Sequence, residues 1–225
     1  MPRCKASEIL RNEAYLGVRR NDEGSGQRRR WAFFTSLLEE SVTMANQFIL
    51  KGKAWVCGDC TDSYKILPEH YWQGGSKVGT LNAEELGKHA MEGADPDFAA
   101  QARSGKYSFI IAGRNFGGGG KSIEHPIFAI KGAGVKAVIA ESSSRYFFRN
   151  AINNGLPILI CEGVTSNVRT GDELEIDLSN GEIRNRTTGA QLKSAPIPET
   201  LMEILQMGGY IPYTKKKMAM ESRER

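Results

Sequence analysis

The sequence predicts an α/β protein with a parallel sheet core and a hairpin-rich C-terminal part. Between Tyr107 and Gly163, short apolar runs alternate with segments of helical periodicity. Such an alternation needs crossover connections and therefore favours parallel strands. After Gly163, turn residues such as Asn180-Gly181 separate short alternating runs, which is typical of antiparallel hairpins.

Length and composition fit one compact domain with extensions. The chain has 225 residues, of which 40% are hydrophobic, and no apolar run approaches the length of a membrane span. The net charge of +4 comes partly from basic runs near the two ends, without interleaved aromatic residues. We therefore expect no nucleic-acid and no membrane partner. Four cysteines and no recognisable secretory signal favour a cytoplasmic location.

The ends of the chain differ in character from its middle. Residues 1–43 are polar and rich in arginine, and we expect them to form a disordered tail or to lie upstream of the biological start at Met44. An organelle-targeting peptide is the competing interpretation. Residues 44–213 would form the folded domain, and residues 214–225 a charged C-terminal tail.

The individual elements follow from their patterns. Brief apolar runs bounded by turn residues indicate buried strands, whereas apolar residues three and four apart indicate helices. The expected elements are a strand in FILKGKAWVCGD, a helical segment within 80–103, strands at 109–112, 135–140 and 157–161, helices at 123–130 and 147–153, a helix at 198–207 that Gly208-Gly209 caps, and an extended piece at 210–213.

A glycine run follows the strand at 109–112. The run spans Gly117, Gly118, Gly119 and Gly120, and Lys121 and Ser122 come directly after it. Main-chain N–H groups between a strand's carboxyl end and a helix start can bind anions, so this loop predicts a phosphate or carboxylate site. Four glycines are costly to order unless the backbone must approach something closely, which favours a functional role for Lys121 and Ser122.

Two patterns admit competing interpretations. Cys57-Gly58-Asp59-Cys60 is formally a CxxC, but no second CxxC or His pair completes a metal site, so two reduced thiols are favoured. The segment from Asn115 to Ser122 approaches the P-loop pattern G-x-x-x-x-G-K-[ST] and departs from it at Asn115. That alternative would make Lys121 a phosphate ligand and Ser122 a magnesium ligand.

Four segments of the chain match the segments of a known family in the same order. They are GKAWVCGD…ILPEHYW, AGRNFGGGGKSIEHPIFAIKGAGVKAVIAESSSRYFFRNAINNGLPI, GDELEIDLSNGEIRN and IPETLMEILQMGGYIPY. Together, over roughly residues 44–213, they resemble the small-subunit family of 3-isopropylmalate dehydratases, the swivel domain of the aconitase superfamily. The resemblance implies a swivelling β/β/α domain of the aconitase C-terminal type.

The resemblance also implies a function. Members dehydrate and rehydrate a hydroxy di- or tricarboxylic acid together with a large subunit. That subunit holds a 4Fe-4S cluster, and this chain would bind none. The expected partners are therefore an iron–sulfur large subunit and a small carboxylic-acid substrate. Self-association of the isolated chain stays open, as does the choice among isopropylmalate, dimethylmalate and homoaconitate.

The family signature N-F-G-x-G-S-S-R-E-H falls on the glycine loop with changes. Counted back from Glu124-His125, its arginine falls on Ile123 and its two serines fall on Ser122 and Lys121, in a loop one residue longer. Lys121 would then replace the arginine as a point charge without bidentate geometry. Either Lys121 or Ser122 would replace the usual serine base. The expected catalytic residues are Ser122, Lys121 and Asp62, and the expected substrate-binding residues are Gly117, Gly118, Gly119, Gly120, Asn115, Thr61 and Ser63.

Two alternatives to this assignment stay open. The family's Thr-Asp pair matches Thr61-Asp62 only if gaps are allowed, and falls on Ser63-Tyr64 without them. The changed loop also leaves open an inactive paralogue that binds the large subunit without supporting turnover.

Overall fold

The computed structural model describes residues 48–71, 82–119 and 122–222 of the chain. Contacts divide the chain into two units, Met1–Ala45 and Asn46–Arg225, and the described residues all belong to the second. Gly120, Lys121 and the whole predicted tail at 1–43 lie outside the described residues. No helix within the described ranges is long and apolar enough to cross a membrane.

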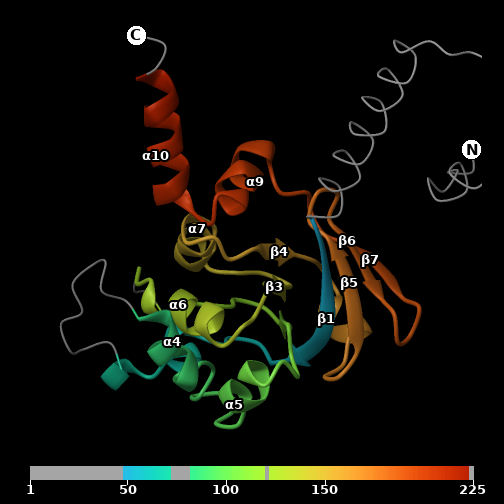
Figure 1. Ribbon diagram of the computed structural model, residues 1–225. Helices are drawn as coiled ribbons and strands as arrows, with labels where there is room; N and C mark the ends of the chain where they lie inside the picture. Colours follow the sequence, from blue (N-terminus) through green and yellow to red (C-terminus); the bar gives the residue numbers. More distant parts are fainter. Residues whose placement is uncertain (1–47, 72–81, 120–121, 223–225) are drawn as a thin grey trace, which may run out of the picture. The chain divides into compact units, whose positions relative to one another are not determined.

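The strands belong to one seven-stranded sheet. They are β1 (Ile49–Val56), β2 (Phe109–Ala112), β3 (Ala137–Ala140), β4 (Ile158–Ile160), β5 (Glu173–Asp177), β6 (Glu182–Asn185) and β7 (Gln191–Lys193). Their order in the sheet is β4-β3-β2-β1-β5-β6-β7. Strands β1 to β4 pair in parallel, and β5, β6 and β7 extend the sheet from β1 with antiparallel pairing. The predicted parallel core and C-terminal hairpins are therefore confirmed (Figure 1).

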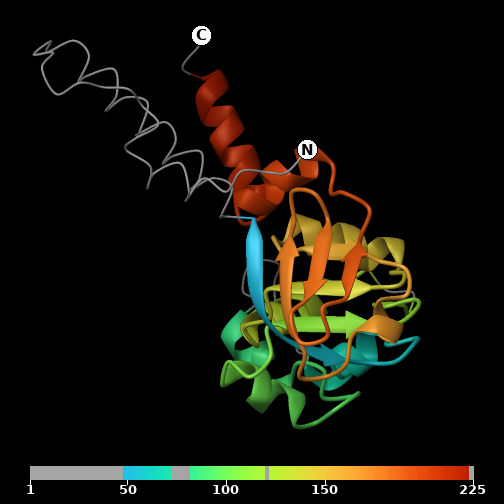
Figure 2. The same cartoon turned by 90° about the vertical axis from the view of Figure 1, so that its right-hand side faces the viewer.

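The parallel strands are buried on both faces, as the near-continuous apolar runs predict. In β2, Ile110 and Ala112 point into one core cluster, and Phe109 and Ile111 point into the other. The first cluster includes helical residues such as Phe98. The second includes residues of β5 and β6, since these antiparallel strands stand across β2 and β3 (Figure 2). The sheet thus folds over itself to bury its second face.

The helices that the structure describes are α3 (Ser63–Ile66), α4 (Ala83–Leu86), α5 (Phe98–Arg103), α6 (His125–Gly132), α7 (Arg145–Asn153), α8 (Val164–Asn167), α9 (Glu199–Gln206) and α10 (Tyr210–Glu221), with short 3₁₀ turns η2 (Glu69–Tyr71) and η3 (Gly87–His89). Helix α7 ends at Asn154-Gly155 as expected, with Gly155 at φ +70°. Helix α6 begins two residues later than expected and runs through Gly132 to its C-cap at Ala133.

One expectation about the C-terminus is wrong. The extended piece predicted at 210–213 is instead the first turn of helix α10, which continues into the charged segment after residue 213. Gly209, at φ 134°, redirects the chain after α9, and Pro212 lies in the first turn of α10. Proline is tolerated there because the N–H groups of a first helical turn have no partner within the helix. Glycine and proline therefore separate two helices here instead of ending the helical region.

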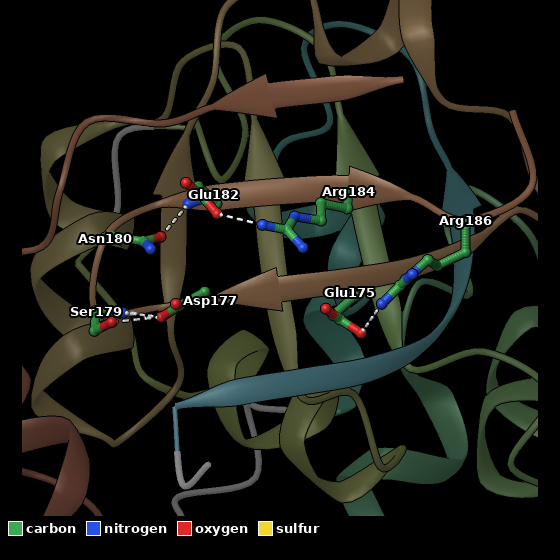
Figure 3. A network of polar contacts seen from close by, with 7 residues as sticks. All are labelled: Glu175, Asp177, Ser179, Asn180, Glu182, Arg184 and Arg186. Atoms are coloured by element: carbon green, nitrogen blue, oxygen red, sulfur yellow. Dashed lines mark hydrogen bonds and ion pairs between the residues drawn. The ribbon is translucent and has the colours of Figure 1, made fainter. Parts of the chain in front are cut away.

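The outer face of β5 and β6 carries a polar network (Figure 3). Arg186 donates to Glu175 at 2.6 Å, and Arg184 donates to Glu182 at 3.0 Å. These side chains alternate along each strand with buried residues such as Ile176 and Ile183, so this face is the solvent side of a half-buried antiparallel sheet. Exposed pairs of this kind contribute little to stability.

Candidate active site

The glycine loop begins where β2 ends and crosses the carboxyl end of β3. Phe116 forms an isolated parallel bridge with Ser143, which continues the β2–β3 pairing beyond the regular strands. Asn115 has a left-handed backbone with φ +55°, a conformation that is uncommon outside glycine and concentrates at functional loops. The loop therefore lies at the carboxyl edge of the parallel strands, as the sequence predicts.

The turn after β1 holds the loop from one side. The Gly117 N–H donates to the Thr61 carbonyl at 2.8 Å, and both the N–H and the hydroxyl of Ser63 donate to the Gly118 carbonyl at 3.0 Å. Thr61 and Ser63 are each only 3% exposed. The structure thus brings both predicted binding residues to the loop, and their burial favours holding it over touching a substrate.

Asp62 is the more accessible member of this turn. Its Oδ1 accepts the N–H groups of Tyr64 and Lys65 at 3.1 and 2.9 Å, so Asp62 caps the N-terminus of α3. A Cβ added at Gly119 would lie 3.6 Å from the Asp62 Cβ. The structure therefore places this predicted catalytic carboxylate directly beside the exposed part of the glycine loop.

Ser122 is the first residue that the structure describes after Gly120 and Lys121. It is exposed, and Asn150 of α7 donates to its hydroxyl oxygen at 3.4 Å and to the Ile123 carbonyl at 3.3 Å. The expectation that the glycine run leads directly into a helix is wrong, because α6 begins only at His125. Its N-cap position holds the carboxylate residue Glu124, which opposes anion binding at that helix end.

Three serines after β3 hold the loop from the opposite side, and sequence reasoning passed over them. Ser142 accepts the Asn115 N–H at 2.9 Å, Ser143 donates to the Phe116 carbonyl at 3.1 Å, and Ser144 donates to the Gly117 carbonyl at 2.7 Å. The available signal was a run of three hydroxyl residues directly after a strand that neighbours the strand before the loop.

A pocket of about 430 Å³ opens beside the loop at the ends of β2, β3 and β4. Arg114, also passed over, lines it together with Glu141 and Ser142. The Arg114 side chain is 78% exposed, and its Nε lies 3.7 Å from Glu141 Oε2. A larger hollow of about 560 Å³ adjoins Gly105 and Lys106, which precede β2. That hollow lies at the opposite ends of the strands and does not belong to this site.

The described residues hold no group of three or more His, Cys, Asp or Glu side chains that could bind a metal ion. Cys57, Cys60 and Cys161 are free thiols. The part of the chain that the structure describes therefore does not fit an iron–sulfur cluster.

Comparisons with known proteins show what this chain is similar to. A family model described as the Aconitase C-terminal domain matches residues 78–162. The isopropylmalate/citramalate isomerase small subunit of Methanocaldococcus jannaschii is 48% identical over 171 residues, which cover 76% of this chain and 96% of that protein. The 3-isopropylmalate dehydratase small subunit 2 of Archaeoglobus fulgidus is also 48% identical, over 73% of this chain and 94% of that protein.

A solved structure shows the same fold. The crystal structure of 3-isopropylmalate dehydratase from Methanocaldococcus jannaschii superimposes with a TM-score of 0.69 at 37% identity, and the match covers 79% of this chain and 99% of that one. The predicted resemblance and the aconitase C-terminal type of domain are thereby confirmed. The chain belongs to the family of 3-isopropylmalate dehydratase small subunits.

Proposed function

We propose that this chain is the small subunit of a hydro-lyase that dehydrates and rehydrates a hydroxy dicarboxylic acid of the isopropylmalate type. The observation that carries the proposal is the 48% identity to a named small subunit across 96% of that protein's length. The glycine loop, which lies between two turns at the carboxyl ends of parallel strands, supplies a place for the chemistry.

The residues around the loop suit this reaction. Removing a proton from a carbon next to a carboxylate needs a base close by, and the charge that develops needs fixed donors. In the proposal, Ser122 Oγ or Lys121 Nζ takes the proton, and main-chain N–H groups of the glycine run bind a substrate carboxylate. Asp62 lies beside the loop as a second proton-handling group.

The partner in this proposal is a large subunit that carries an iron–sulfur cluster. Its open iron would act as the Lewis acid on the departing hydroxyl. This chain contributes the loop, Asp62 and Ser122 and closes the site from its own side. A cytoplasmic location is part of the same proposal.

The P-loop interpretation finds no support in the matches. Within the loop, the Gly117 N–H already donates to the Thr61 carbonyl and is therefore not available to a phosphate. The inactive paralogue remains as the second candidate, and the position of Ile123 in place of an arginine favours it. Only a measurement of turnover distinguishes an active small subunit from an inactive paralogue.

The test uses the full chain together with an iron–sulfur large subunit of the family. We expect the chain alone to carry no iron and to show no dehydratase activity, and the reconstituted pair to turn over isopropylmalate. Stoichiometric iron–sulfur absorbance in the isolated chain would overturn the assignment of the cluster to the partner. An inactive pair that still assembles would favour the paralogue.

Lys121→Ala tests the site within the same pair. We expect it to abolish turnover while the chain still folds and assembles, because the variant loses a cation and a candidate base at the loop. Lys106→Ala is the matched control, because Lys106 lies before β2 whereas the glycine loop lies after β2. The kinetics of the Lys106→Ala pair should match those of the wild type. Unchanged kinetics of Lys121→Ala would remove Lys121 from the site.

A further inference from the structure

Two main-chain N–H groups of the glycine loop are left available. Among the hydrogen bonds of the described residues, the Gly117 N–H has an acceptor, whereas the N–H groups of Gly118 and Gly119 have none. Gly118 is nevertheless buried and Gly119 is exposed. Buried main-chain donors in proteins are nearly always paired, so the Gly118 N–H calls for an acceptor, and the exposed Gly119 N–H beside it is open to the same carboxylate.

The carbonyl groups that precede these two N–H groups are both held. The Gly117 carbonyl accepts the Ser144 hydroxyl at 2.7 Å. The Gly118 carbonyl accepts the N–H and the hydroxyl of Ser63, each at 3.0 Å. Ser63 is the first residue of α3 and Ser144 is the N-cap of α7, so the two serines reach the loop from different elements.

Holding a carbonyl fixes the direction of the next N–H. The peptide unit is planar and trans, and therefore its C=O and N–H point to opposite sides. The bond from Ser144 to the Gly117 carbonyl thus turns the Gly118 N–H away from Ser144. In the same way, the bonds from Ser63 turn the Gly119 N–H away from Ser63. Without these bonds a glycine peptide could rotate freely, because glycine has few steric limits.

The Ser144 hydroxyl performs two tasks at once. It is the N-cap of α7, where it accepts the Phe147 N–H at 3.2 Å, and it donates its own proton to Gly117. Glycine has no side-chain acceptor, but at an N-cap position it destabilises a helix much less than alanine does. The loss of the bond to Gly117 can therefore be tested with little loss of helix stability.

We propose that Ser144 and Ser63 are positioning residues that aim the N–H groups of Gly118 and Gly119 at a carboxylate of the substrate. Neither side chain touches the substrate; both act through the glycine peptides. This inference deepens the proposed function and rests on it for the identity of the ligand.

Three substitutions at one position test the proposal in the reconstituted pair. Ser144→Gly removes the hydroxyl and both of its bonds with little loss of helix stability, Ser144→Thr keeps both bonds, and Ser144→Ala loses both bonds with a larger loss of helix stability. We expect Ser144→Gly to raise KM about tenfold with little change in kcat, because a donor that binds substrate and transition state alike acts on KM. Ser144→Thr should stay within about twofold of the wild type in KM, since its hydroxyl can make both bonds.

Two further variants serve as comparisons. Ser63→Ala should raise KM less than Ser144→Gly does, because the Ser63 N–H still donates to the Gly118 carbonyl. Asn82→Gly weakens the cap of α4, which has no described hydrogen bond to the loop, and should leave KM unchanged. A Ser144→Gly pair with wild-type KM would overturn the proposal, and so would a Ser144→Thr pair as impaired as Ser144→Gly.

Hydrogen exchange separates this inference from the proposed function. In the isolated chain, Ser144→Gly should speed amide exchange in the peptide that spans Asn115 to Gly119, whereas Ser144→Thr should not. Were the wild-type pair inactive on isopropylmalate, the proposed function would fail, and the exchange measurement would still decide whether Ser144 holds the loop. Equal exchange in Ser144→Gly and the wild type would overturn the positioning role, whatever the activity.

Discussion

Cys57 and Cys60 stand three residues apart in very different surroundings. Cys57 is 8% exposed, and burial raises the pKa of its thiol to about 11, against the opposing effect of a hydrogen bond with Thr61. Cys60 is exposed and has a left-handed backbone with φ +52°. A reactive thiol needs an accessible group with a lowered pKa, so Cys57 has the environment of an inert buried thiol.

This difference predicts selective alkylation of the native chain. With a pKa of about 11, roughly one Cys57 thiol in a thousand is ionised at pH 8, and burial hinders access further. Iodoacetamide at pH 8 should therefore modify Cys60 and spare Cys57, as followed by peptide mass spectrometry. Cys161 serves as an internal control and should also be spared, because burial and the nearby Glu141 raise the pKa of its thiol. Equal rates at Cys57 and Cys60 would contradict the assignment.

At the scale of elements, close approach explains one glycine of the loop. Gly117 has φ +68°, and a Cβ on it would lie 2.2 Å from Cγ of the Phe147 ring on α7. Phe147 is 3% exposed and packs edge-on against Phe116 at a centroid distance of 5.0 Å. The absence of a side chain at Gly117 therefore lets the loop lie against the first turn of α7.

Gly117→Ala should consequently destabilise the chain by two effects. The left-handed backbone costs about 1–2 kcal/mol for alanine, and the clash with Phe147 adds about 1–3 kcal/mol of overpacking. Gly105→Ala separates the two, because Gly105 has φ +82° but nothing within 4 Å of an added Cβ. Urea unfolding should show a larger loss for Gly117→Ala than for Gly105→Ala. Equal losses would mean that Phe147 moves aside without cost.

Much of the element order follows from the sequence, and the exceptions have local causes. The strand at 109–112 and the C-cap of α7 at Asn154-Gly155 match the prediction because short apolar runs and terminal glycines are local signals. Helix α10 was missed since Gly209 and Pro212 end some helices and begin others. The positions of Thr61 and Ser63 at the loop could be predicted, but their burial could not.

For the whole molecule, the described sheet depends on β1. This strand pairs with β2 on one side and with β5 on the other, and so joins the parallel half to the antiparallel half (Figure 1). Its first residue is Ile49. The proposed domain boundary at Met44 leaves this strand complete.

Two truncations test that boundary. Removal of residues 1–43 takes away none of the described core residues and should leave the free energy of unfolding of the domain unchanged to within about 0.5 kcal/mol. Removal of residues 1–53 takes away Ile49–Lys53, which pair with β5, and should prevent cooperative unfolding. Thermal and urea unfolding measure both. A large loss on removing only residues 1–43 would show that the domain extends further toward the N-terminus.

The sequence alone determined the α/β class, the order of the central elements and the family resemblance, because these depend on patterns within short stretches. Only the tertiary structure decided how the loop is held. Ser63 and Gly118 are 55 residues apart and Ser144 and Gly117 are 27 apart, and strand pairing brings them together. A hydrogen bond acts over about 3 Å, so which amides of a glycine run stay free depends on the partners that the folded sheet places around it.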